Sequence, residues 1–90
     1  MMAPNDIVLS LAGHDKHSLF LIVAADGDRL LLCDGRHHRL SNPKSKNPRH
    51  VRFLCKGEAP ATDRQLSQTL ARIAAGLADK PEEEINLGER

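Results

Sequence analysis

The stretch LFLIVAADGDRLLLCDG, residues 19–35, decides the fold because it holds two apolar runs on either side of a turn signal. Both runs have the length of strands and are far shorter than the roughly 18 to 20 apolar residues that a membrane helix needs. The Asp26-Gly27 pair between them suits the positive φ angles of a tight hairpin. The pattern therefore predicts a β-hairpin, followed by a second turn at Asp34-Gly35.

Alternating apolar residues predict further strands on both sides of this hairpin. In DIVLSLAG, every second residue from Ile7 to Leu11 is apolar, and Gly13 ends the segment. In HVRFLC, the same alternation would turn Phe53 inward and Arg52 outward. Four or five short strands within about 50 residues are typical of a small barrel or a strongly bent sheet.

Two polar segments connect the predicted hairpin to the last strand. RHHRL, residues 36–40, is expected to form a short polar strand or an extended segment. SNPKSKNP, residues 41–48, contains two Asn-Pro pairs, which disfavour helix and offer turns. We therefore predict a loop over 41–48, which would be the most basic tip of the protein.

The hydrophobic period changes to 3.6 in TDRQLSQTLARIAAGLAD, residues 62–79, which predicts a helix. Thr62 and Gln65 have the spacing of a capping box. The apolar stripe of this helix comprises Leu66, Leu70, Ile73, Ala74 and Leu77. The fold class expected is thus mainly β with one helix, in one small domain with a modest core. We expect a barrel over 1–57, a linker and C-terminal amphipathic helix over 58–79, and an acidic flexible tail over 80–90.

The net charge of +1 conceals three blocks of opposite sign. Residues 1–35 contain two basic and five acidic residues, residues 36–57 contain seven basic residues and no acid, and residues 58–90 contain four basic and seven acidic residues. A segregated basic block is typical of a surface that meets a polyanion. The alternative is a solvated loop rich in lysine and arginine.

The aromatic content limits the kind of partner. The chain has no Trp or Tyr, and its two phenylalanines, Phe20 and Phe53, fall on apolar strand patterns and are expected in the core. Stacking of single-stranded bases and capture of proline-rich peptides both need exposed aromatic rings. The predicted helix has balanced charges, which makes it a poor reader of the DNA major groove. Recognition of folded RNA by its backbone and shape remains.

Metal and catalytic sites are not expected. Cys33 and Cys55 stand 22 residues apart, and the nearby histidines lack the paired spacing of a structural zinc site. The two cysteines are interpreted as reduced core thiols of a cytoplasmic protein, since no secretory leader precedes the first strand. The serine, histidine and aspartate of GHDKHS lie in one turn and cannot form a catalytic triad, so we do not expect an enzyme.

The order of AGHDK, an apolar strand, DRLLLCDGRHHRL and NPKSK resembles the bacterial KOW-domain RNA-binding proteins. These are small relatives of KOW-type proteins of the large ribosomal subunit in archaea and eukaryotes. The resemblance covers roughly residues 6–56 and implies an SH3-like β-barrel whose loops contact RNA. The positions that match the turns and the basic segment of the family are Gly13, Asp15, Lys16, Asp34, Gly35, Lys44 and Lys46.

Two positions depart from the family pattern. His14 stands where an arginine is usual, and His17 stands where the characteristic glycine is expected. A glycine adopts positive φ angles far more readily than a histidine, so the geometry of this turn is the open question of the resemblance.

We therefore expect a non-enzymatic, cytoplasmic protein that binds structured RNA, with ribosomal RNA or the ribosome as the natural partner, and without a membrane, metal or cofactor. The alternative is a protein interaction module that uses the C-terminal helix or the barrel surface, with a basic loop that is only solvated. The expected RNA contacts are Lys16, Arg36, His37, His38, Arg39, Lys44, Lys46, Arg49 and Arg52. The expected structural turns lie at Gly13, Gly27, Asp34 and Gly35.

Overall fold

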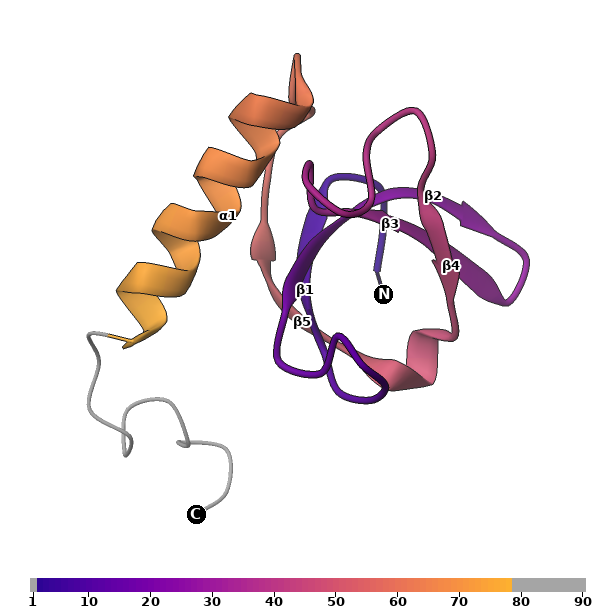
Figure 1. Cartoon of the computed structure of the whole chain (residues 1–90). Coiled ribbons are helices and arrows are strands. Elements are labelled where there is room, and N and C mark those ends of the chain that lie inside the picture. Colours follow the sequence, from indigo (N-terminus) through magenta and orange to yellow (C-terminus); the bar gives the residue numbers. More distant parts are fainter. Residues whose placement is uncertain (1, 79–90) are drawn as a thin grey trace.

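A computed structural model describes residues 2–78 and shows a strongly bent sheet with a long helix against its outer surface (Figure 1). The elements are β1 (Asp6–Ser10), β2 (Leu19–Asp26), β3 (Arg29–Cys33), β4 (Lys44–Lys46), the 3₁₀ helix η1 (Pro48–His50), β5 (Val51–Lys56) and α1 (Asp63–Ala78). The strand order is β4-β3-β2-β1-β5, and all neighbours are antiparallel. The prediction of a mainly β, barrel-like domain with one C-terminal helix is confirmed. The predicted tail over 80–90 lies outside the described residues.

The central hairpin, β2 and β3, is buried on both faces of the sheet. The inner cluster, enclosed by the barrel, comprises Val8, Phe20, Ile22, Leu30, Leu32 and Val51. The outer cluster, between the sheet and α1, comprises Ile7, Leu19, Leu21, Cys33, Leu66 and Leu70. Because successive side chains alternate between the two faces, a strand that is buried on both sides needs a continuous apolar run. This requirement explains why LFLIVAA shows no polar alternation.

Strand β4 corrects the predicted loop over 41–48. Its three residues pair with β3, with Lys46 opposite Leu30 and Lys44 opposite Leu32. The segment 36–40, predicted to be extended, instead forms bends. Strand β4 cannot be predicted from a local sequence pattern, because it contains no apolar residue and depends on pairing with a distant strand.

Strand β5 corrects the predicted core position of Phe53. A β-bulge interrupts its pairing with β1, so that Ile7 lies opposite Cys55 and Val8 lies opposite Phe53, while Leu54 is the additional residue. The bulge allows both Leu54 and Cys55 to pack partly buried against the outer cluster, which strict alternation would forbid. Phe53 lies on the other face and is 45% exposed, whereas Phe20 is buried as expected.

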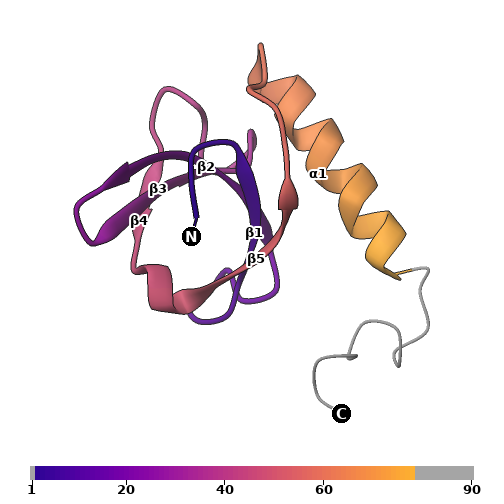
Figure 2. The same ribbon diagram turned by 180° about the vertical axis from the view of Figure 1, so that it is seen from behind.

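Helix α1 packs on its own barrel, as Figure 2 shows from the opposite side. Leu66 and Leu70 are buried, Ile73 packs partly buried beside them, and Ala74, placed on the predicted stripe, is exposed. Thr62 Oγ1 accepts a hydrogen bond from the backbone N–H of Gln65, which confirms the predicted cap. Among the described residues, no helix has the length and apolarity that a membrane crossing requires.

Candidate nucleic-acid interface

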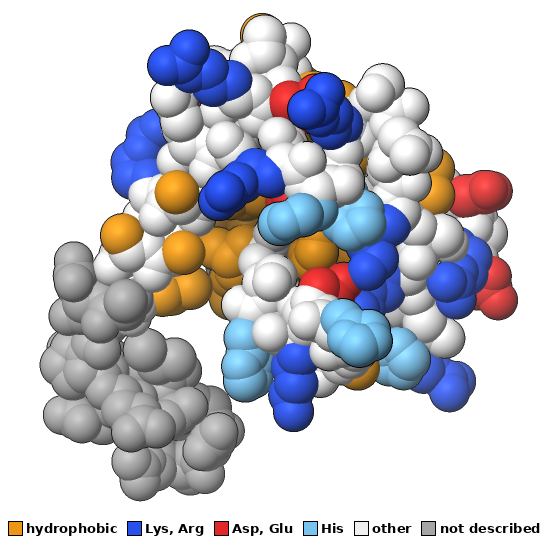
Figure 3. Space-filling view, viewed as in Figure 1, with side chains coloured by type: hydrophobic (Ala, Val, Ile, Leu, Met, Phe, Trp, Pro, Cys, Tyr) orange, Lys and Arg blue, Asp and Glu red, His pale blue; other side chains and the backbone are white. Residues whose placement is uncertain are grey.

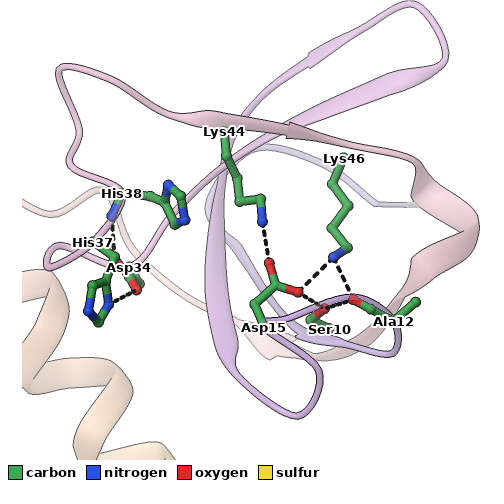
Figure 4. A network of polar contacts seen from close by, with 8 residues as sticks. All are labelled: Ser10, Ala12, Asp15, Asp34, His37, His38, Lys44 and Lys46. Atoms are coloured by element: carbon green, nitrogen blue, oxygen red, sulfur yellow. Dashed lines mark hydrogen bonds and ion pairs between the residues drawn. The ribbon is translucent and has the colours of Figure 1, made fainter.

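The loop over 11–18, which joins β1 to β2, is organised around the carboxylate of Asp15 (Figure 4). Asp15 Oδ1 lies 2.7 Å from Ser10 Oγ and 2.7 Å from Lys46 Nζ, and Oδ2 accepts a hydrogen bond from Lys44 Nζ. Lys46 Nζ also donates to the carbonyl oxygen of Ala12 at 2.8 Å. The carboxylate thus joins the 11–18 loop to strand β4, about thirty residues away in sequence.

Lys44 and Lys46 are not the free loop cations that the sequence predicted. Their pairing partners, Leu32 and Leu30, belong to the inner cluster, so both lysines start on the inner face of the sheet. Their aliphatic stems cover apolar surface while the ammonium groups reach Asp15 at the mouth of the barrel. Lys46 is only 8% exposed and therefore serves the fold, while Lys44 remains partly accessible.

The ionisation of Asp15 follows from these partners. Burial alone would raise the pKa of the carboxyl, because it removes water from the charged form. Hydrogen bonds from Lys44, Lys46 and Ser10 outweigh this effect and hold the pKa of Asp15 well below its usual range. The group therefore remains a carboxylate at neutral pH, and its charge is balanced inside the protein.

The loop over 34–43, which joins β3 to β4, is closed by a second aspartate. Asp34 Oδ1 accepts hydrogen bonds from the backbone N–H groups of Arg36 and His38, both at 2.9 Å. Although burial acts in the opposite direction, these bonds lower the pKa of Asp34. The turn also has Gly35 at a φ of 79°, which confirms the predicted turn position.

Helix α1 holds the 34–43 loop in place. Asp63 Oδ1 accepts a hydrogen bond from the backbone N–H of Leu40 at 2.7 Å. Gly35 approaches the helix so closely that an added Cβ would lie 2.2 Å from the carbonyl oxygen of Asp63. No local sequence pattern indicates this contact, because Asp63 and Leu40 lie 23 residues apart in the chain.

The backbone at His17 closes the 11–18 loop in a left-handed conformation. His17 has a φ of 77°, so the histidine adopts the left-handed conformation that a glycine would favour. The backbone N–H of His17 donates to the carbonyl oxygen of Ser10 at 2.8 Å, which closes the loop. Gly13 and Gly27, the other predicted turn glycines, also have positive φ angles.

The two loops meet around a shallow hollow that carries histidines. Its lining includes His14 from the 11–18 loop, His37 and His38 from the 34–43 loop, and Lys44 from β4. The His38 ring lies against Phe20, with 6.1 Å between the ring centroids, and His37 Nδ1 lies 3.8 Å from Asp34 Oδ2. The hollow therefore combines imidazole donors with one partly accessible ammonium group.

Besides His37, five predicted contact residues are exposed. They are Lys16, Arg36, Arg39, Arg49 and Arg52. Within residues 2–78, their side chains form no ion pair and no hydrogen bond.

The backbone N–H of Leu11 donates to the carbonyl oxygen of His50, which places η1 beside the 11–18 loop. We call the exposed surface of the 11–18 loop, the 34–43 loop and η1 the loop face. In Figure 3, cationic and histidine side chains surround the end of the barrel that faces the viewer.

The described residues contain no group of three or more His, Cys, Asp or Glu side chains that could hold a metal ion. Both cysteines are free thiols, and Cys33 Sγ donates to the carbonyl oxygen of Arg39 at 3.1 Å. Burial, followed by the nearby carboxylates of Asp63 and Asp34, raises the pKa of the Cys33 thiol to about 11. Cys33 is therefore a structural thiol that braces the 34–43 loop.

Models of known protein families do not match the chain, and a search of curated proteins gives no significant match.

Proposed function

We propose that this protein binds folded RNA through the loop face, without enzymatic activity. The observation that carries the proposal is the contrast between two kinds of charge on this surface. The carboxylates of Asp15 and Asp34 are satisfied internally, whereas Lys16, Arg36 and Arg49 extend to solvent without a partner among the described residues. Such a surface presents an excess of unpaired cations to an approaching phosphate backbone.

The resemblance to KOW-domain proteins supports structured RNA as the ligand, with ribosomal RNA in the cytoplasm as the first choice. The free thiols of Cys33 and Cys55 fit a reducing compartment. The apolar stripe of α1 gives less support to the alternative of a protein interaction module, because Leu66 and Leu70 are already buried against the barrel.

The proposal is tested by measuring affinity for folded ribosomal RNA fragments and for a DNA duplex of similar length across a salt series. If about five exposed cations neutralise phosphates, the logarithm of the binding constant should fall with a slope of roughly −3.5 to −4.5 against the logarithm of salt concentration. Affinity would then fall by roughly 130- to 500-fold between 50 and 200 mM salt. No RNA binding at 50 mM salt would refute the proposal.

The variants for this test avoid the lysines that hold the barrel together. Arg36→Glu combined with Arg49→Glu reverses two exposed charges on the loop face and should weaken RNA binding by at least tenfold at 100 mM salt, about two phosphate contacts. The matched control is Arg29→Glu combined with Arg72→Glu, which changes the net charge equally at exposed positions on the β2–β3 hairpin and on α1. Arg72 lines a groove with the 56–60 segment, whereas Arg36 lines a separate hollow with other residues of α1. Equal weakening by both pairs would show that only net charge matters.

A further inference from the structure

Phe53 is a partly exposed aromatic ring on strand β5. Within the described residues, Phe53 and Leu11 are the large apolar side chains that remain exposed, at 45% and 40%. Phe53 lies on β5, an edge strand of the sheet, and its opposite residue, Val8, is already fully buried. The bulge beside it directs Leu54 and Cys55 toward the outer cluster and leaves the ring on the other face. Bulges of this kind often reorient a side chain beside a functional site.

The ring forms one wall of an open hollow. The hollow has a volume of about 470 Å³ and is lined by Met2, Asp6, Phe53 and Lys56. Asp6 and Lys56 are opposite each other in the β1–β5 pairing, and Val8 and Phe53 are the next such pair beyond the bulge. The Phe53 ring, the Asp6 carboxylate and the Lys56 side chain therefore line the same hollow.

One carboxylate oxygen and one ammonium group at this hollow have no hydrogen-bond partner among the described residues. Asp6 is 3% exposed, and its Oδ2 atom accepts a hydrogen bond from the backbone N–H of Ala3 at 2.8 Å. Its Oδ1 atom accepts no hydrogen bond from the described residues, and the nearest ammonium group, Lys56 Nζ, is 3.9 Å away. The side chain of Lys56 is 84% exposed and is free to turn toward an anion.

We propose that this hollow binds one unpaired nucleobase of the RNA, an inference that rests on the proposed function. The base stacks on the Phe53 ring, an N–H group of the base donates to Asp6 Oδ1, and Lys56 contacts the adjoining phosphate. Each of the four bases carries an N–H donor on its Watson–Crick edge, and base pairing occupies it. The site therefore selects for the unpaired state of a nucleotide more than for its identity.

The position of the hollow along β5 suits an RNA that is held by the loop face. Strand β5 begins directly after η1 and extends for about 17 Å from Val51 to Lys56. Arg49 is exposed at the start of this path and Lys56 at its end, and the chain from residue 35 to residue 57 contains no acid. A strand leaving a folded RNA on the loop face can follow these cations to the hollow. The charge favours RNA over an apolar peptide added to the edge of the sheet.

The test compares three RNA stem-loops that share the same paired sequence. One is fully paired, one has a single bulged adenosine, and one has an abasic residue at the bulge. The unaltered protein should bind the bulged RNA about tenfold more tightly than the other two, as one base stacked on an aromatic ring gives. Phe53→Ala should abolish this preference and leave the affinity for the paired stem unchanged, while Phe53→Tyr should retain it. Gln68→Ala is the matched control, because it shortens an exposed side chain on α1 outside the loop face and the hollow, and it should leave the preference unchanged.

A bulged 2-aminopurine provides a direct signal of stacking. The protein contains no Trp or Tyr, so the fluorescence of the probe is read without interference. Quenching on binding should be lost with Phe53→Ala and retained with Phe53→Tyr.

Equal affinity for the three RNAs would overturn this inference and leave the proposed function standing, whereas binding to none of them would overturn both. A dimer of the unaltered protein that Phe53→Ala dissociates would assign the ring to pairing between copies of the chain and would also overturn the inference.

Discussion

The substitution Asp15→Asn tests whether the carboxylate at the mouth of the barrel holds the fold together. It keeps the size of the side chain and removes the charge that faces Lys44 and Lys46. The Lys46 ammonium, in a side chain only 9% exposed, would keep the Ala12 carbonyl and lose its anionic partner. Removing one partner of a buried ion pair costs about 3–5 kcal/mol. Since Lys44 can turn partly to solvent, we expect the free energy of unfolding to fall by about 2–4 kcal/mol.

Urea denaturation followed by circular dichroism measures this loss, because the chain has no Trp or Tyr to report unfolding by fluorescence. A domain of this size has a total stability of about 5–10 kcal/mol, so the expected loss is a large fraction of it. The loss should move the urea midpoint by about 2 M. The control, Asp28→Asn, removes an exposed aspartate on the β2–β3 hairpin and should change stability by less than about 0.5 kcal/mol. Adding Lys46→Met to Asp15→Asn should recover at least half of the loss, because no buried charge then lacks a partner.

The same substitution has a defined pH dependence. The pKa of Asp15 is lowered in the folded state, so the folded protein binds fewer protons than the unfolded chain as the pH falls. The stability that this group contributes is fully present above about pH 5, and it is lost progressively as the pH falls below the ordinary aspartate pKa of about 3.9. The difference between the unaltered protein and Asp15→Asn should therefore be constant from pH 7 to 5 and shrink below pH 4. The reasoning is refuted if Asp15→Asn is as stable as Asp28→Asn at pH 7.

Three other predictions concern the loops and the buried thiol. Gly35→Ala should lower the free energy of unfolding by more than about 2 kcal/mol, because the residue has a positive φ and its new Cβ would lie 2.2 Å from a helix carbonyl oxygen. Gly27→Ala, with a φ of 63° and no atom within 4 Å, should cost only about 1 kcal/mol in the same urea titration. His17→Gly should raise the melting temperature and stabilise the protein by about 0.5–1 kcal/mol, since it relieves a left-handed histidine; an unchanged or lower melting temperature would contradict this strain. Cys33, with a pKa raised to about 11, should resist iodoacetamide at pH 8 until the protein unfolds, while the less buried Cys55 reacts first. Mass spectrometry of the alkylated peptides measures this order, and the reverse order would contradict the assignment.

The features that could be predicted from the sequence are those with a local cause. The β2–β3 hairpin follows from two apolar runs around Asp26-Gly27, and the start of α1 follows from the Thr62 cap. Strand β4 could not be predicted, because its Lys-Ser-Lys sequence shows no strand period and is stabilised by pairing with β3 and by Asp15.

The sequence predicted the cations of the candidate site but not which of them stabilise the fold and which are free to contact a ligand. The sequence placed Lys44 and Lys46 together with Arg36 and Arg49 as equivalent cations. The structure separates them, because the register of β4 against β3 directs the lysines inward, whereas the arginines lie on exposed loops. In the same way, a bulge in the β1–β5 pairing turns Cys55 toward the outer cluster, and neither this bulge nor the exposure of Phe53 could be predicted from a local pattern. Register and bulges arise from contacts between distant segments.

The pairing of the first strand with the last strand has a consequence for how the chain folds during synthesis. Since β1 needs β5 to complete its hydrogen bonds, the sheet cannot finish forming until residue 56 has left the ribosome. The apolar outer face of β1 and β2 then stays uncovered until α1 emerges, about twenty residues later. A nascent chain halted between these two points would expose Ile7, Leu19 and Leu21 to solvent, and it would be a natural substrate for chaperones.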